Sequence, residues 1–172
     1  MLRLRPYKRC DAEHIVNWIK TEKSFYQWSA GRLGEYPITA AALTDYYDSM
    51  ADRDDFYEMT AMDGCEVAGH MIMRFLDEKK TSLRFGFVVV DDTKRGKGYG
   101  REMLWLALKY AFEILKVSRV TIGVFVNNAP AYKCYKSLGF VESSSEPREN
   151  YKILNEEWEC VYLEMTEDML NV

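Results

Sequence analysis

The feature that most constrains this chain is a cluster of three glycines between two segments of different periodicity. Residues 88–90 are all valine, β-branched and apolar on both faces, as expected of a central strand. Gly96, Gly98 and Gly100 follow, and glycine permits positive φ and close approach of the backbone to a ligand. Apolar residues then recur in steps of four, three and four, on one face of a helix: Leu104, Leu108, Ala111 and Leu115. We therefore expect a buried strand, a tight turn and a long helix, in that order.

The remaining patterns predict further strands and helices on both sides of this unit. Strand-like periodicity occurs at residues 2–5, 56–61, 66–75, 83–90, 120–126, 140–141 and 158–165. Asp11 and Thr39 are expected to cap helices, a third helix follows the glycines, and a fourth runs from Asn128 to Gly139. Residues 25–36 are expected to be irregular. The predicted fold is α/β (α+β): one domain over residues 1–172, with a mixed, mostly antiparallel sheet of six to seven strands and about four helices on its faces.

Composition excludes several classes of protein. Of 172 residues, 48% are hydrophobic and 29% charged, which is ordinary for a globular protein. No apolar run approaches the roughly 18 residues that cross a bilayer, and the N-terminal residues lack the apolar segment of a signal peptide. The net charge of −4 argues against a nucleic-acid surface. We expect a cytoplasmic protein without a nucleic-acid or membrane partner.

The cysteines and histidines form no recognisable metal site. The four cysteines are scattered at Cys10, Cys65, Cys134 and Cys160, without a CxxC pair, and the chain has two histidines. We expect no metal ion, and we expect these thiols to be free and buried.

Positive charge is concentrated at the glycine turn. Lys94, Arg95, Lys97 and Arg101 lie in a stretch, residues 93–101, that contains no acidic residue. The free N–H groups of a helix's first turn favour a phosphate, and these cations would add charge-assisted contacts. The turn lacks the GxxxxGK[ST] of a P-loop, and its GxGxG spacing does not fit a dinucleotide fold, which also requires an acid about 20 residues on, near Ser118.

Two motifs resemble those of the GNAT superfamily of N-acetyltransferases. Residues 95–100, Arg-Gly-Lys-Gly-Tyr-Gly, match its fingerprint Arg/Gln-x-x-Gly-x-Gly/Ala after a central strand. Residues 128–140, Asn-Ala-Pro-Ala-Tyr-Lys-Cys-Tyr-Lys-Ser-Leu-Gly-Phe, match the second family signature. The resemblance spans nearly the whole chain. The acidic, aromatic start and the strands around Trp158 look closest to the ribosomal-protein and polyamine acetyltransferases.

The resemblance implies acetyl-CoA as cosubstrate, transfer of its acetyl group to a primary amine, and no metal. In such enzymes the fourth and fifth strands splay apart and the pantetheine arm lies between them, which would place the backbones of Val88 and Val90 on that arm. A donor amide near Val88 or Val89 would polarise the thioester carbonyl. The implied pyrophosphate site comprises Arg95, Gly96, Lys97, Gly98, Tyr99, Gly100 and Arg101. Asn128 would contact the cofactor or simply cap its helix, and Tyr135 matches the general acid that protonates the departing thiolate.

The general base is not evident. Relatives carry Glu near the start of the fourth strand, where residues 83–85 are Leu-Arg-Phe, or on the next strand, where Gly123 stands. Four other acids remain candidates: Asp45, Glu58, Glu156 and Glu157.

The acceptor and the assembly also stay open at this point. A polyamine, an antibiotic amine or a peptide N-terminus would each fit, and a non-catalytic acyl-CoA-binding module is the alternative function. Residues 25–36 and the helix around Asp45, Tyr46 and Tyr47 either shape the acceptor pocket or form core or the face of a homodimer.

Overall fold

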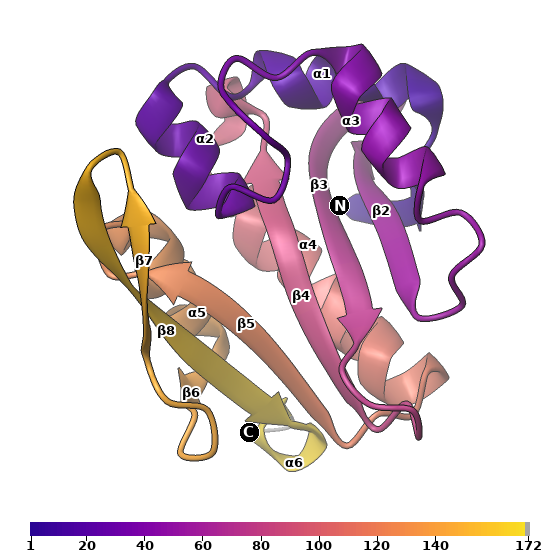
Figure 1. Ribbon diagram of the computed structural model, residues 1–172. Coiled ribbons are helices and arrows are strands. Elements are labelled where there is room, and N and C mark those ends of the chain that lie inside the picture. Colours follow the sequence, from indigo (N-terminus) through magenta and orange to yellow (C-terminus); the bar gives the residue numbers. More distant parts are fainter. Residues whose placement is uncertain (171–172) are drawn as a thin grey trace.

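The computed structural model describes residues 1–170, which form a mixed eight-stranded sheet with helices on both faces (Figure 1). Its strands are β1 (Leu2–Pro6), β2 (Phe56–Asp63), β3 (Glu66–Phe75), β4 (Ser82–Val90), β5 (Arg119–Phe125), β6 (Val141–Glu142), β7 (Glu149–Ile153) and β8 (Glu156–Thr166). The strand order is β1-β2-β3-β4-β5-β8-β6, and β7 pairs with β8. Only the β4–β5 pairing is parallel among the described strands, because a helical crossover joins those two.

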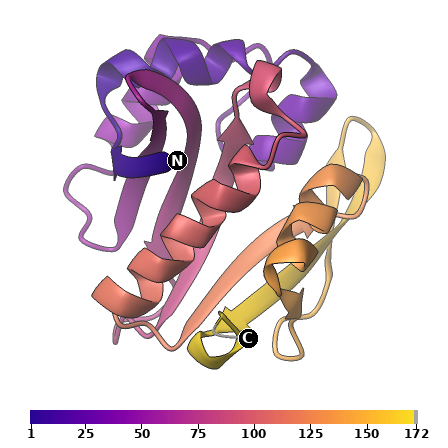
Figure 2. The same cartoon turned by 180° about the vertical axis from the view of Figure 1, so that it is seen from behind.

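The helices divide between the two faces of the sheet. They are α1 (Ala12–Asn17), α2 (Glu22–Ser29), α3 (Ala40–Asp48), α4 (Tyr99–Lys109), α5 (Ala129–Leu138) and α6 (Glu167–Leu170). Helices α1–α3 lie over the upper part of the front face in Figure 1, and α4 and α5 cover the rear face in Figure 2. A π-helical turn, Tyr110–Ile114, extends α4.

Two apolar clusters hold these layers together. One joins α4 and α5 to the rear of the sheet, with fully buried residues such as Met103, Leu108 and Phe85. The other joins α1–α3 to the front, through residues such as Ile15 and Phe25. The predicted fold class is confirmed, with more strands and more helices than the sequence patterns indicated.

Three elements were missed, namely α2, β7 and the short α6, and the first two omissions have a physical cause. Helix α2 lies in part of the segment expected to be irregular, because Thr21 and Ser24 form a capping box that starts it before the aromatic run. Strand β7 has the exposure pattern of an edge strand that pairs only with β8, so little of it is apolar.

The two predicted helix caps turned out differently. Thr39 accepts a hydrogen bond from the Ala42 N–H, as a capping residue does. The predicted side-chain cap at Asp11 is wrong. The Asp11 carboxylate is buried and instead binds the Arg5 guanidinium at 2.7 Å, together with the Thr60 hydroxyl at 2.8 Å. It therefore ties the N-terminal strand to β2.

Strands β4 and β5 separate halfway along their length. Their pairing runs from Ser82 opposite Arg119 to Phe85 opposite Ile122 and then stops, and Figure 1 shows the two strands diverging toward α2. On its other side β4 carries a bulge, because Gly86 pairs with Ile72 while Val89 pairs with His70. Such a bulge leaves an extra residue unpaired and re-aims the strand.

His70 is a buried histidine whose protonation should destabilise the fold in acid. Its Nε2 lies 2.5 Å from the Tyr47 hydroxyl, its Nδ1 has no partner among the described residues, and burial lowers its pKa from 6.5 to about 3. Below pH 6.5 the unfolded chain binds a proton that the folded chain does not. We expect His70 alone to lower the free energy of unfolding by about 1.6 kcal/mol between pH 6.5 and pH 5.

Urea unfolding of the parent and of His70→Gln at these two pH values measures this effect. The variant should lose less stability on acidification than the parent. The exposed His14 supplies the control, since His14→Gln should retain the parent's dependence. Equal acid sensitivity in the parent and His70→Gln would contradict the assignment.

Candidate active site

A groove of about 720 Å³ opens where β4 and β5 separate. The ends of both strands, the glycine turn and α5 line it. Val88 and Val90 are among the lining residues, at the expected place on β4. The groove therefore connects the unpaired part of the sheet to the first turn of α4.

The glycine turn has the backbone conformation that its composition predicts. Gly96 and Gly98 have φ of 72° and 87°, a region that residues with a Cβ rarely adopt. Gly98 is the N-cap of α4, so the free N–H groups of that helix begin at the turn. A Cβ on Gly100 would lie 3.6 Å from Val90 and 3.7 Å from Cys134, in ordinary contact. Positive φ, rather than close packing, accounts for the first two glycines.

The cations of the turn have different surroundings. Arg101 lines the groove without an ion-pair partner among residues 1–170, and Arg95 lines it while donating to the Trp18 carbonyl at 3.0 Å. Lys94 binds Glu66 at 2.9 Å, and Lys97 donates to the Thr93 carbonyl and does not line the groove. The structure thus brings together all the predicted residues of segment 95–101 except Lys97.

Helix α5 contributes the two polar residues that the second motif predicts. Asn128 caps it, accepting from the Ala131 N–H at 3.4 Å, and also lines the groove. Tyr135 lines the groove two turns later and is 6% exposed. Its hydroxyl has no hydrogen-bond partner in the described part of the chain, and burial raises its pKa above the usual 10. This tyrosine is therefore protonated at neutral pH and has its proton free to donate.

A smaller cavity of about 100 Å³ adjoins the groove on the side of α2. The two share lining residues from α2, β4 and β5, including Trp28, Gly86 and Gly123. Gln27, which lines both, donates to the Asn127 carbonyl at 3.2 Å and so links α2 to the loop after β5. The two cavities therefore adjoin along α2, β4 and β5.

None of the residues that line either cavity is acidic in the part of the chain that the structure describes. Glu58 is half-buried, and burial raises its pKa, but it lines neither cavity. The other three candidates, Asp45, Glu156 and Glu157, are exposed and likewise outside both. A side chain at Gly123 would press on the Tyr162 ring, because a Cβ there would lie 3.2 Å from it.

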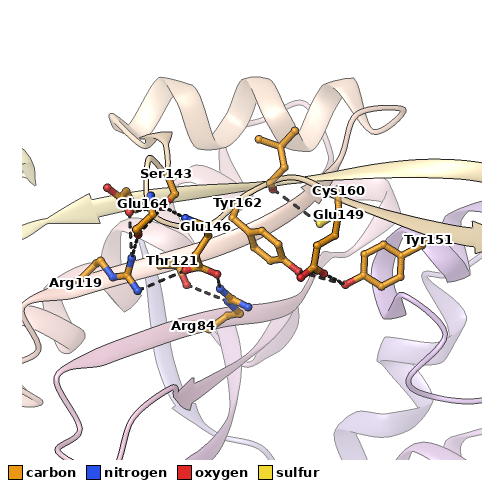
Figure 3. Close-up of polar contacts among 12 residues, drawn as sticks. Arg84, Arg119, Thr121, Ser143, Glu146, Glu149, Tyr151, Cys160, Tyr162 and Glu164 are labelled. Carbon is orange, nitrogen blue, oxygen red and sulfur yellow. Dashed lines mark hydrogen bonds and ion pairs between the residues drawn. The ribbon is translucent and has the colours of Figure 1, made fainter.

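Sequence reasoning missed the polar groups around the smaller cavity. Tyr162, Tyr151 and the carboxylate of Glu149 lie together in Figure 3, with both hydroxyls 2.9 Å from that carboxylate. Arg32, Arg74 and Arg84 line the cavity as well. No local motif marks any of these residues, since strand register brings them together.

Two expectations about cysteine and metal chemistry were tested against the described residues. The cysteines are free, but the prediction that all are buried is wrong: Cys160 is buried, Cys134 is half-buried, and Cys10 and Cys65 are exposed. Within residues 1–170, no three His, Cys, Asp or Glu side chains are grouped as a metal ion would require.

No helix in that range has the length and apolar character to span a membrane.

A splayed mixed sheet, a glycine turn at a helix N-terminus and a buried tyrosine beside the groove are the features of an acyl-CoA N-acyltransferase-like protein. Comparison with known proteins agrees. Residues 1–141 match the model of the acetyltransferase (GNAT) domain. The chain belongs to this family, and it is an N-acetyltransferase with acetyl-CoA as cosubstrate.

Individual relatives are more distant. The chain is 27% identical to the L-amino acid N-acetyltransferase AaaT of Escherichia coli over 68% of this chain and 72% of that protein. It is 24% identical to the prophage-derived N-acetyltransferase YokL of Bacillus subtilis over 62% of this chain, and the match spans 60% of that relative's length. A spermidine N-acetyltransferase from Vibrio cholerae, crystallised with CoA and spermine, has the same fold, with a TM-score of 0.82 at 20% identity and coverage of 99% and 98%.

Proposed function

We propose that this protein transfers the acetyl group of acetyl-CoA to a primary amine of a small molecule, by direct attack of the amine on the thioester. The observation that carries the proposal is the placement of Tyr135, buried with an unpartnered hydroxyl, in the groove that begins at the glycine turn. A non-catalytic acyl-CoA-binding module would not require that hydroxyl.

The groove accounts for each part of the cofactor. Pantetheine would lie along β4 from Val88 to Val90, where pairing with β5 has ended and the bulge leaves a backbone group free. The pyrophosphate would be bound by the first-turn N–H groups of α4, by the glycines and by Arg95 and Arg101. Asn128 would contact the cofactor from the start of α5.

The acetyl transfer requires few groups of the protein. The amine nitrogen forms a bond to the thioester carbon, and an amide near Val88 or Val89 stabilises the oxyanion. The carbon–sulfur bond then breaks, and Tyr135 donates its proton to the leaving sulfur. The nitrogen loses its proton to water, and the tyrosine is reprotonated from solvent. We assign no general base, because the described lining of both cavities contains no carboxylate.

The acceptor would occupy the smaller cavity, which meets the groove at Gly86 and Gly123. The names of relatives indicate amino acids in one case and spermidine in others, and both are amines. A panel of amines, with release of the CoA thiol as the readout, tests the proposal. Thiol release with none of them, from a protein that binds acetyl-CoA, would contradict it.

Acetyl-CoA should stabilise the fold measurably. At 100 times its dissociation constant a ligand adds about 2.7 kcal/mol to the free energy of unfolding. For a chain of this size that corresponds to a rise in Tm of about 5–10 °C. Thermal melts with and without acetyl-CoA measure the shift. A folded protein whose Tm does not respond to millimolar acetyl-CoA would contradict both the enzyme and the binding module.

A further inference from the structure

The smaller cavity is lined by positive charge without a matching negative charge. Arg32, Arg74 and Arg84 contribute to its wall, and no aspartate or glutamate among the described residues does. This balance is unexpected for the acceptor site of an enzyme whose substrate is an amine, since a protonated amine would be repelled.

One of the three arginines is neutralised within the protein. Arg84 is ion-paired with Glu146, donates to the Thr121 hydroxyl at 3.0 Å and lies over the Tyr162 ring at 4.4 Å (Figure 3). Arg119 binds the other oxygen of Glu146 at 3.5 Å and Glu164 at 3.2 Å. The charges of Arg84, Arg119, Glu146 and Glu164 thus cancel, and this cluster of four residues holds Arg84 in place.

Arg74 is left with its charge unpaired. It stands directly opposite Arg84 in the β3–β4 register, where two like charges destabilise a sheet. Among residues 1–170 its guanidinium has no hydrogen-bond or ion-pair partner, although it is half-buried. Burial, together with Arg32 and Arg84, lowers its pKa. Arg32, in the loop after α2, is exposed and is likewise unpaired within the described range.

The carboxylate of Glu149, beside the cavity, is not paired with Arg74. Glu149 accepts hydrogen bonds from the Tyr151 and Tyr162 hydroxyls and does not line the cavity. The Arg74 guanidinium has no partner among the described residues, and a bound oxyanion would match its planar set of donors.

We propose that the acceptor amine also carries an anionic group, a carboxylate or another small oxyanion, which binds Arg74 and Arg32 in the smaller cavity. This inference rests on the proposed function and specifies its substrate class: amino acids rather than polyamines. The cavity's volume of about 100 Å³ accommodates a group of several heavy atoms, since one water occupies about 30 Å³ of liquid. The amine would then extend through the junction at Gly86 toward the thioester.

Binding can be measured apart from turnover. Calorimetry on the protein saturated with CoA, which carries no acetyl group, would compare the twenty L-amino acids with their carboxamides, and would include 2-aminoethylphosphonate and spermidine. We expect at least one amino carboxylate to bind about 10- to 100-fold more tightly than its carboxamide and than spermidine, or the phosphonate to exceed spermidine by the same factor. Which of the two anions binds distinguishes a carboxylate site from a phosphoryl site. Spermidine or the carboxamides binding as tightly as every anion would overturn the inference.

Arg74→Gln tests the residue itself. The variant should lose that preference, raising KM for the anionic acceptor by about 10- to 100-fold while leaving acetyl-CoA affinity unchanged. Its Tm should not fall, because the substitution removes an unpaired charge. Arg53→Gln is the matched control, since Arg53 is exposed, binds Asp55 and lies outside both cavities, and it should leave KM unchanged.

An unchanged preference for anions in Arg74→Gln would overturn the assignment of this residue. Failure of the proposed function and failure of this inference would give different results. Anion binding without thiol release from any amine would contradict the proposed function, and thiol release confined to amines without an anionic group would contradict this inference alone.

Discussion

Tyr135→Phe should retain acetyl-CoA binding and lose turnover by about 10²- to 10⁴-fold, the usual contribution of a positioned general acid. A thiol has a pKa near 8.5 in water and a tyrosine near 10, so complete proton transfer is uphill by roughly 2 kcal/mol. Burial raises the pKa of Tyr135 further, and it raises that of the neighbouring Cys134 thiol as well. A thiolate leaving in the same groove would be a stronger base for the same reason, which keeps the transfer feasible.

The substitution isolates the hydroxyl because phenylalanine preserves the packing of the ring against Phe140. Tyr132→Phe is the control: Tyr132 lies one turn earlier on α5, is half-buried and does not line the groove. It should turn over at the parental rate. If Tyr135→Phe also turned over at that rate on an amine shown to be a substrate, Tyr135 would be a packing residue. The proton would then have to come from water or from Cys134.

Gly98→Val should lower acetyl-CoA affinity by about 10- to 100-fold while the fold survives. Valine at a φ of 87° is strained by about 1–2 kcal/mol, and its side chain would enter the space assigned to the pyrophosphate. The strain lowers stability and not affinity. A lost hydrogen bond to a charged group costs approximately 1.5–3 kcal/mol of binding free energy, and each 1.4 kcal/mol corresponds to a factor of ten. No protein atom lies within 4 Å of a Cβ built on Gly98, so the protein alone has room for it.

Gly34→Val separates the strain from the loss of the phosphate site. Gly34 has a φ of 86° and equally open surroundings, but it lies outside the lining of both cavities. The two variants should lose similar stability in thermal melts, and only Gly98→Val should lose affinity in calorimetry with acetyl-CoA. Equal affinities in these variants would place the phosphates elsewhere.

Elements defined by local patterns were predicted well. The helix from Asn128 to Gly139 has both of its predicted caps, since Asn128 binds the Ala131 N–H and Gly139 adopts a φ of 106°. The hairpin predicted from the strands at 56–61 and 66–75 is present, and it turns at Gly64 and Cys65, since Asp63 still pairs with Glu66. Capping and turn formation depend on residues three or four apart, so the sequence contains the whole interaction.

Residues that act through distant partners were not predictable in the same way. Asp11 has the sequence context of a helix cap, yet Arg5 and Thr60 together offer its buried carboxylate better hydrogen bonds. Gly123 stands where the family resemblance led us to look for a glutamate, and only the register of β5 against β8 shows that the Tyr162 ring lies against it.

The sequence by itself determined the glycine turn, the helix that follows it, the tyrosine of α5 and, through these motifs, the family of acetyltransferases to which the chain belongs. The tertiary structure alone decided where β4 and β5 separate and which side chains surround the smaller cavity. Arg74 and Arg84 are ten residues apart and carry no motif, yet pairing of β3 with β4 makes them neighbours. The physical reason is that a motif encodes contacts between residues a few positions apart. The charge that lines a cavity depends instead on side chains from several strands, and the register of those strands is fixed by the whole hydrophobic core.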